Sequence, residues 1–386
     1  MTEGTGEAPH LRVIKVLTVF GTRPEAIKLA PVIRELESRP DAFVSRVCVS
    51  GQHRQMLDQM LDLFGIRPDY DLDVMRHDQS QSHVTVAVLD GMRQIFANEA
   101  PDWVLVQGDT TTTMAGGLGA FHHGCRVAHV EAGLRTFDNR DPWPEEVNRR
   151  VAAVVADLHF APTEIIARNL YDEGIPKDRV HVTGNTVIDA LKLVASMPFD
   201  PKGTPVARIP LDGRRLIVAT MHRRHSSPRP VEEVCAALLA VARRHRDAQI
   251  VFPVHMNPNV RLPLDRLLSA VPNITLLPPL DYKPMVWLLH RCHFVITDSG
   301  GLQEEAAALG KPVLVIRAKT ERPEGVAAGI VRLVGTDRQT IARWAMRLLS
   351  DTRAYQRMAH SAAAYGSGDA ARKIVDALSE RSGVSR

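Results

Sequence analysis

Carboxylate side chains follow two apolar runs that are typical of buried strands. Asp109 comes after the run Trp103–Gln107, and Glu131 comes after the run Arg126–Val130. Because the carboxyl ends of parallel strands meet at one edge of a sheet, we expect these two carboxylates to lie close together. Neighbouring carboxylates push their pKa values apart, so that one can serve as an acid and the other as a base. Two alternatives stay open: Asp109 only caps the next helix, or Glu131 only pairs with Arg135.

A third acidic segment, DPWPEEVNRR, predicts the start of a helix at Pro144. Glu145 and Arg149 have the i, i+4 spacing of a favourable ion pair, and so do Glu146 and Arg150. The ordinary interpretation of such a pattern is a solvent-exposed helix start, and a functional site is the alternative.

Two other segments predict anion sites at helix N-termini, where free N–H groups favour a phosphate. In FGTRPEAIKLAP, Arg23 lies at the start of a predicted helix and Lys28 lies one turn further on. In TDSGGLQEEAAALGKP, the small residues Ser299–Gly301 follow a strand, and Glu304 and Glu305 lie one turn into the helix, where a carboxylate can accept hydrogen bonds from ribose hydroxyls. The alternatives are a capped helix with solvated charges and a plain glycine turn.

Histidines also follow predicted strands in the second half of the chain. TMHRRHSS offers His222, Arg223, Arg224 and His225 together, a set that suits binding and protonating a phosphate leaving group. His255 ends another strand, and a structural role is the ordinary interpretation for a lone histidine. The four cysteines have no metal or redox spacing, and GxGxxG is missing after the first strand, so we expect no metal and no nicotinamide cofactor.

The amino-acid composition excludes several classes of protein. The chain has 386 residues with 48 basic and 44 acidic side chains, a net charge of +4, and 45% hydrophobic residues. These values are typical of a globular protein and too weakly basic for nucleic-acid binding. The chain lacks an apolar run of roughly 20 residues and a signal-peptide pattern, so we expect no membrane partner and a cytoplasmic location.

The elements that must position these residues alternate between short apolar runs and amphipathic helices, a pattern of βα units around parallel sheets. In the first half, strands are predicted at 13–20, 44–49, 103–107, 126–130, 157–160 and 180–182. Helices are predicted at 24–38, 53–63, 83–99, 111–122, 145–155 and 163–173.

A segment rich in proline and glycine, Ser196–Arg215, predicts a domain boundary. Beyond it, strands are predicted at 216–219, 250–253, 274–277, 294–297 and 313–316, then a polar loop at 319–329 and a last helical stretch at 354–379. The expected architecture is two doubly wound α/β domains, 1–195 and 196–386, with a ligand cleft between them and with the last helix able to pack back on the first domain.

The motifs together resemble those of the non-hydrolysing UDP-N-acetylglucosamine 2-epimerase family, from about residue 14 to about residue 380. They are FGTRPEAIKLAP, QGDT, VEAGLRT, WPEEVNRR, FAPTE, VTGNTVIDAL, PVHMNPNV, TDSGGLQEEA and TERPEGVAAG. The resemblance implies a GT-B type fold, two Rossmann-like domains with the active site in the cleft between them, and usually a homodimer. It also implies reversible conversion of UDP-N-acetylglucosamine (UDP-GlcNAc) into UDP-N-acetylmannosamine (UDP-ManNAc) with no metal or redox cofactor.

The resemblance further implies roles for the residues found above. Asp109, Glu131 and Glu145 correspond to the acid/base carboxylates of the family, with their individual roles left open, and His222 corresponds to a histidine near the diphosphate. The positions that match UDP and phosphate binding are Arg23, Lys28, Arg149, Ser299, Gly300, Gly301 and Glu305.

A second UDP-GlcNAc molecule activates many bacterial members, and Gln52, Gln55, Arg223 and His255 match that allosteric pocket. Two departures occur here: the usual HRREN reads HRRHS at residues 222–226, and Asp78 stands where an arginine is expected. An acidic residue would repel a diphosphate, so we expect activation to be weakened, lost or altered. A hydrolysing epimerase that releases UDP and ManNAc, and a GT-B glycosyltransferase, are the alternative functions.

Overall fold

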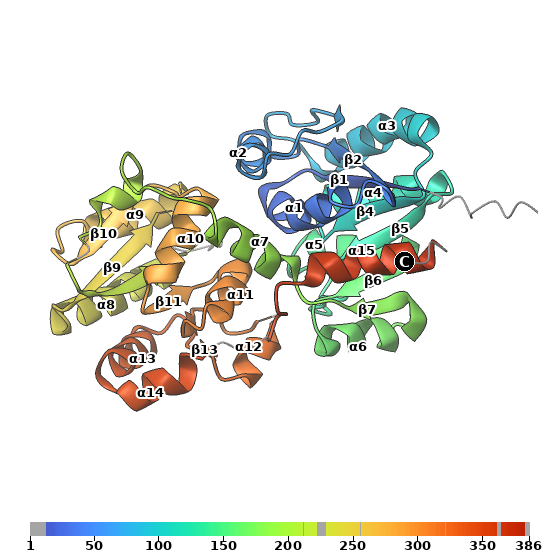
Figure 1. Cartoon of the computed structure of the whole chain (residues 1–386). Coiled ribbons are helices and arrows are strands. Elements are labelled where there is room, and N and C mark those ends of the chain that lie inside the picture. The colour runs from blue at the N-terminus through green and yellow to red at the C-terminus, as the bar shows by residue number, and fades with distance from the viewer. Residues whose placement is uncertain are drawn as a thin grey trace, which may run out of the picture. The chain divides into compact units, whose positions relative to one another are not determined.

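The computed structural model describes residues 13–210, 212–221, 229–254, 256–320, 322–360 and 364–382 (Figure 1). They form two compact units. The first contains the described residues up to Ala190 and those from Gly366 onwards, and the second is Leu191–Tyr365. The division therefore falls at Ala190, inside a helix, whereas the sequence predicted it at residue 195, and the last helix of the chain belongs to the first unit.

The first unit contains a seven-stranded parallel sheet in the order β3-β2-β1-β4-β5-β6-β7. Its strands are β1 (Ile14–Phe20), β2 (Phe43–Val49), β3 (Tyr70–Asp71), β4 (Trp103–Gln107), β5 (Arg126–Val130), β6 (Leu158–Ala161) and β7 (Val180–Val182). The chain winds from β1 towards β3 on one side and from β4 towards β7 on the other, so the direction of winding reverses between β1 and β4. Ligands of doubly wound sheets bind at such a reversal, beyond the carboxyl ends of the strands.

Eight helices of this unit are described in the ranges given above. They are α1 (Arg23–Glu37), α2 (Arg54–Phe64), α3 (Gln81–Glu99), α4 (Thr111–His122), α5 (Glu145–Val155), α6 (Glu164–Asp172), α7 (Thr186–Ala195), whose end lies in the second unit, and α15 (Ala370–Arg381). The last of these packs against α1, as Figure 1 shows. An ion pair between Arg39 and Asp376 (2.7 Å) and a hydrogen bond from the Ala371 N–H to Asp189 (3.0 Å) fasten it there.

The second unit contains a six-stranded parallel sheet in the order β10-β9-β8-β11-β12-β13. Its strands are β8 (Arg215–Ala219), β9 (Ala248–Pro253), β10 (Ile274–Leu277), β11 (Phe294–Thr297), β12 (Val313–Val315) and β13 (Val331–Leu333). Its helices are α8 (Arg229–Arg244), α9 (Pro258–Leu268), α10 (Tyr282–Arg291), α11 (Gly300–Ala308), α12 (Pro323–Ala327), α13 (Arg338–Ser350) and α14 (Thr352–Met358). Two Rossmann-like doubly wound sheets confirm the predicted GT-B type of architecture.

Each sheet is built from strands that are apolar on both faces, because helices cover both sides. In β4 all five residues are buried, and so are all six residues of β9. The neighbouring helices supply the rest of the core with residues such as Leu29, Leu238 and Leu288. Within the described part of the chain, no helix combines the length and hydropathy needed to cross a membrane.

Two predictions of the sequence are wrong. The stretch 354–379 is not one helical stretch, because Gly366 and Gly368 have φ angles of +111° and +78°, and α14 and α15 lie on either side of them. The segment 319–329 contains the helix α12, which Pro323 starts, and it leads to a further strand, β13, that extends the sheet.

Candidate active site

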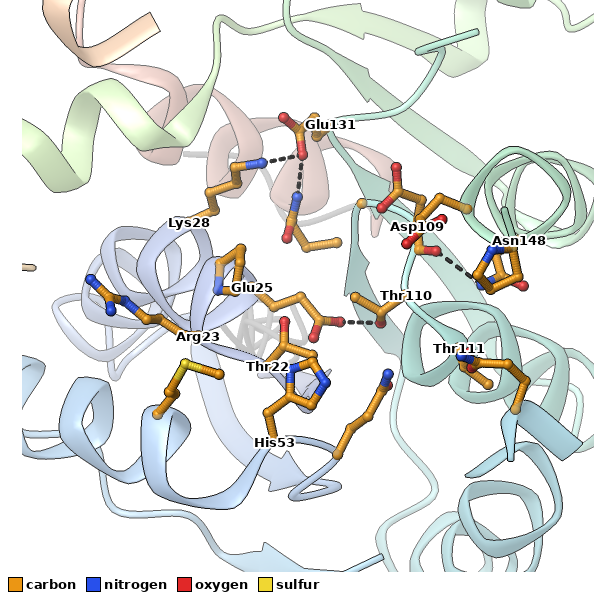
Figure 2. A pocket seen from close by; sticks show the side chains of 18 residues that line it. Thr22, Arg23, Glu25, Lys28, His53, Asp109, Thr110, Thr111, Glu131 and Asn148 are labelled. Atoms are coloured by element: carbon orange, nitrogen blue, oxygen red, sulfur yellow. Dashed lines mark hydrogen bonds and ion pairs between the residues drawn. The ribbon is translucent and has the colours of Figure 1, made fainter. Parts of the chain in front are cut away.

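A cavity of about 440 Å³ lies at the carboxyl ends of β1, β4 and β5 (Figure 2). Its walls are the loops that follow β1, β2, β4 and β5 and the first turns of α1 to α5. The lining includes Asp109, Glu131 and Glu145, together with the basic residues Arg23 and Lys28. The structure therefore brings the three predicted carboxylates to one cavity of the first unit, beside the reversal in strand order.

Glu131 is buried at the edge of this cavity and is held by three donors. Its Oε2 receives hydrogen bonds from the Lys28 Nζ (2.5 Å) and from the Gln107 side chain, and its Oε1 receives one from Asn185 (2.9 Å). Figure 2 shows the Lys28 side chain pointing at the carboxylate. These donors, one of them charged, favour the ionised form. Glu131 also has a φ of +60°, a conformation that non-glycine residues adopt rarely and mostly at functional sites.

The alternative role for Glu131, a pair with Arg135, is wrong. The Arg135 guanidinium binds both oxygens of Glu173, the C-cap residue of α6, at 2.7 and 2.6 Å. It therefore ties its own loop to a neighbouring helix.

Asp109 also has its own cation. An Arg149 guanidinium nitrogen lies 2.5 Å from its Oδ2, and Asn148 donates to the Asp109 carbonyl oxygen (3.0 Å). Asp109 does not cap α4, because the cap is Thr110, whose hydroxyl accepts from the Thr113 N–H (3.0 Å). Removal from water raises the pKa of Asp109, and the nearby Glu131 raises it further, against the opposing effect of Arg149. Such a carboxylate binds a proton more tightly than a solvated one.

The start of α5 is far less solvated than its charge pattern predicts. Glu145 is the first residue of α5 and lines the cavity. Glu146 is completely buried, where it accepts from the N–H groups of Thr136 (3.0 Å) and Phe137 (3.2 Å) and pairs with Arg149 (3.4 Å). Its side chain therefore fixes the loop after β5 to α5, and the prediction of a solvent-exposed helix start is wrong.

A buried carboxylate, Glu25, lies in the first turn of α1, beside the predicted anion site. Glu25 is buried, and its Oε2 accepts from the Gly21 N–H (3.1 Å) while its Oε1 accepts from the Thr110 hydroxyl (2.7 Å). Burial raises the pKa of Glu25 against these hydrogen bonds. Sequence reasoning missed this residue, although Thr22 and Glu25 have the Thr-x-x-Glu spacing of a capping box. It also missed Gln107 and Asn185, the polar partners of Glu131.

In the second unit, the predicted nest of N–H groups lies at the start of α11, with Ser299 as the N-cap. The Ser299 N–H donates to the Thr297 hydroxyl (3.0 Å). A side chain at Gly300 would collide with the Arg322 guanidinium, 2.5 Å away, whereas the space at Gly301 is open. A larger residue at position 300 would therefore require the Arg322 side chain to move, and the close approach of Arg322 brings a positive charge to this helix end.

The predicted ribose partner, Glu305, is buried in the first turns of α11. Its Oε1 accepts from the Tyr282 hydroxyl (2.9 Å), which orients the carboxylate. Its neighbour Glu304 pairs with Arg322. Gly310, with a φ of +68°, follows the end of the helix as predicted.

The predicted allosteric positions differ in their surroundings. Gln52 is buried and accepts from the Thr112 hydroxyl (2.8 Å) at the rim of the cavity, and Gln55 is exposed on α2. Asp78 is also exposed and pairs with His77 at 3.0 Å. The residues 222–226, which include His222, Arg223, Arg224 and His225, lie outside the described residues, as does His255. Within the ranges that are described, no group of three His, Cys, Asp or Glu side chains could hold a metal ion.

Comparison with known proteins shows the family that this chain resembles. The family described as UDP-N-acetylglucosamine 2-epimerase matches residues 34–379. The UDP-N-acetylglucosamine 2-epimerase of Escherichia coli K12 is 50% identical over 381 residues, which cover 95% of this chain and 98% of that protein.

Two solved structures are also similar over nearly the whole chain. One is the Neisseria meningitidis UDP-GlcNAc 2-epimerase bound to UDP-GlcNAc, with 46% identity, a TM-score of 0.88 and coverage of 95% of this chain and all of the other. The other is the Methanocaldococcus jannaschii UDP-GlcNAc 2-epimerase in complex with UDP-GlcNAc and UDP, with 30% identity, a TM-score of 0.80 and the same coverage. The chain belongs to the UDP-N-acetylglucosamine 2-epimerase family of enzymes.

Proposed function

We propose that this enzyme interconverts UDP-GlcNAc and UDP-ManNAc by eliminating UDP and adding it back, without hydrolysis of the sugar intermediate. The observation that carries the proposal is the pair of carboxylates Asp109 and Glu131 in one cavity, each held by its own cation. Epimerisation needs charged groups that stay in place while protons move at the sugar, and both groups meet this requirement.

The chemistry follows from the weak acidity of the proton on C2, which no carbonyl group activates. The C1–O bond breaks first, and its electron pair leaves with UDP. A carboxylate then takes the C2 proton, and the C–H electrons form the C1=C2 double bond of a 2-acetamidoglucal. In the return reaction, a proton is added to the opposite face of C2 and the UDP oxygen forms the bond to C1 again. The reaction therefore needs proton-transfer groups on both faces of the sugar.

We assign these roles from the surroundings of each carboxylate. Asp109 takes or returns the C2 proton on one face, since its raised pKa makes it a stronger base than a solvated aspartate. Glu145, at the start of α5 on the cavity wall, serves the other face. Glu131 keeps its charge because of its three donors, and it stabilises the positive charge that develops around C1.

The remaining proposed residues handle the nucleotide. The nest Ser299–Gly301 binds phosphate, and Glu305 binds the ribose hydroxyls, as its oriented carboxylate supports. Arg23 at the cavity contributes a positive charge to the phosphate, and His222 protonates the leaving group. Arg149, which the family resemblance assigned to phosphate binding, has Asp109 as its close partner, and we assign it to holding that carboxylate.

We further propose that the enzyme is a homodimer that pairs through helices of the first unit. Four apolar side chains on the neighbouring helices α3, α4 and α5 are exposed. They are Val86 (58%), Phe121 (58%), Val147 (42%) and Val154 (86%). An exposed apolar group of this kind is typical of a protein–protein contact.

Activation by UDP-GlcNAc is proposed to be weak or lost in this enzyme, because Asp78 adds a negative charge where the family has an arginine. We expect the initial rate at low UDP-ManNAc to be unchanged when traces of UDP-GlcNAc are added. A strong acceleration in the same progress curves would contradict this expectation.

The experiment that tests the proposed reaction is proton NMR of the enzyme with UDP-GlcNAc in D₂O. Signals of UDP-ManNAc that grow while deuterium enters C2 would support epimerisation through cleavage of the C2–H bond. Accumulation of free ManNAc and UDP would indicate the hydrolysing reaction instead. Retention of hydrogen at C2 with no new sugar, although UDP-GlcNAc binds, would favour a glycosyltransferase.

A further inference from the structure

Glu25 connects the two loops that flank the reversal in strand order. Its carboxylate accepts from Gly21 in the loop after β1 and from Thr110 in the loop after β4. The Thr113 hydroxyl lies 3.0 Å from the same Oε1. Figure 2 shows the Glu25 side chain reaching across the cavity floor towards Thr110. Thr110 directly follows Asp109, so the contact acts on the backbone that carries a reacting carboxylate.

The same helix also holds the second carboxylate. Lys28 lies three residues after Glu25 on α1 and contacts Glu131 at 2.5 Å. One helix therefore contacts both the loop of Asp109 and the side chain of Glu131, through two charged residues one turn apart. A small shift or rotation of α1 would change the positions of both groups at once.

Glu25 also changes the role of the α1 N-terminus. The Gly21 N–H, which precedes the N-cap Thr22, donates to this carboxylate. A phosphate close to the first turn of α1 would therefore lie near a buried acidic side chain. At the start of α11 in the second unit, the N–H of the N-cap residue Ser299 donates to the Thr297 hydroxyl.

We propose that Glu25 is a positioning residue for epimerisation: it locks the loop that carries Asp109 onto α1 and onto the loop after β1. The inference rests on the proposed function, because it concerns the placement of the proposed base. Glu25 itself does not contact the substrate in this role. Its loss therefore lowers kcat and leaves nucleotide binding in place.

The test compares Glu25→Gln with Glu37→Gln, an exposed residue of the same helix. Gln has nearly the size of Glu, but it has one acceptor oxygen where the carboxylate has two. Its NH₂ group would therefore face a donor on one of the two loops and could not accept from it. We expect kcat to fall by roughly 10- to 100-fold, as for a misplacement of about 1 Å. The KM for UDP-GlcNAc and the calorimetric Kd for UDP should stay within about threefold, and Glu37→Gln should match the wild type. A wild-type kcat in Glu25→Gln, or equal losses of kcat and UDP affinity, would overturn the proposal.

A second pair of variants covers the case in which Glu25→Gln does not fold. Thr110→Ala removes one donor to Glu25, and Thr110→Ser keeps the hydroxyl for both Glu25 and the cap of α4. We expect kcat to fall in the alanine variant, with its KM maintained, and to recover in the serine variant. Equal kcat in the two variants would refute the lock. Failure of the proposed function would look different, since the wild-type enzyme would then show no C2 exchange in D₂O.

Discussion

At the scale of single residues, the site is a set of buried and partly buried charges that are already paired with one another. Lys28 and Arg149 both resemble phosphate ligands in the sequence, yet each contacts a carboxylate. Glu131 and Asp109 are therefore held in place without a substrate. In the proposed reaction these two carboxylates would lose little freedom when the sugar binds, which favours efficient proton transfer at carbon.

Arg149 should control the pH dependence of the reaction. It opposes the effects of burial and of Glu131 on the pKa of Asp109. Removal of its charge in Arg149→Met therefore raises the pKa of Asp109, and the ionised base is lost at a higher pH. We expect the acid limb of the kcat/KM profile to move to higher pH by about one unit or more, and less in Arg149→Lys.

The matched control is Arg150→Met, since Arg150 is the next residue of the same helix and pairs with Glu146 and Glu173. Its acid limb should coincide with that of the wild type. If Arg149→Met lowers the rate equally at all pH values, Arg149 does not act through the ionisation of Asp109.

At the scale of elements, α15 is part of the core of the first unit although the sequence separates them. Ile374 and Leu378 on α15 are completely buried, and the helix packs on α1, which carries Glu25 and Lys28. Ile374→Ala should destabilise this unit by about 2 to 4 kcal/mol, since the truncation leaves a cavity. Hydrogen–deuterium exchange should then become faster in β1 and stay unchanged in β9.

Lys373→Ala is the control for this change, because Lys373 is adjacent on α15 and its side chain is 41% exposed. It should leave exchange in both sheets close to that of the wild type. If Ile374→Ala instead makes exchange faster in β9 alone, α15 does not stabilise the first unit, and its assignment to that unit is wrong.

The sequence predicts those strands best in which an apolar run ends at a polar residue. The predicted bounds of β4 and β5 agree with the structure residue by residue, because Gly108 and Glu131 mark their ends. The strands β3 and β13 are missed, since their sequences YD and VRL each contain a charged residue and form no apolar run. Their pairing with a neighbouring strand defines them instead.

In the candidate site too, the positions of residues at strand ends could be predicted, whereas contacts between residues far apart in the sequence could not. That Asp109 and Glu131 share one sheet edge could be predicted, because it follows from where parallel strands end. Their partners could not, since Lys28 is 103 positions from Glu131 and Arg149 is 40 positions from Asp109. Local spacing suggested Arg135 as the partner of Glu131, and the fold gives Arg135 to Glu173 instead.

At the scale of the whole molecule, two buried histidines should make its stability depend on pH. Burial lowers the pKa of His129 to about 4 and of His159 to about 3. With the usual unfolded value of about 6.5, the unfolded chain binds more protons below that pH, so stability falls as the pH falls from about 6.5 towards 4. The raised pKa values of Glu25 and Asp109 act in the opposite direction over the lower part of this range.

The measurement is urea unfolding at several pH values with His159→Gln as the comparison, since the variant keeps the other titrating groups. We expect the wild type to lose about 2 to 4 kcal/mol more than the variant between pH 7 and pH 4. Parallel curves for the two proteins would show that His159 is not a buried neutral histidine.

The proposed dimer can be tested through its most exposed apolar residue. Val154→Arg places a charge on the face formed by α3, α4 and α5, and burial of that charge at an interface would be costly. We expect light scattering to show a dimer for the wild type and a monomer for the variant. Val326→Arg changes an exposed valine (39%) on α12 of the second unit and should remain dimeric. A dimeric Val154→Arg protein would contradict this choice of face.

Because the chain returns to the first unit at Gly366, this unit can be completed only at the end of synthesis on the ribosome. The helix that carries Glu25 and Lys28 is synthesised early, but α15, which packs on it, emerges only after the entire second unit. The nascent first unit must therefore expose the apolar surface around α1 while some 175 further residues, Leu191–Tyr365, are translated. A premature stop codon in α15 would therefore destabilise the first unit, although most of that unit is encoded at the start of the message. The apolar surface that stays exposed around α1 is of the kind that chaperones bind.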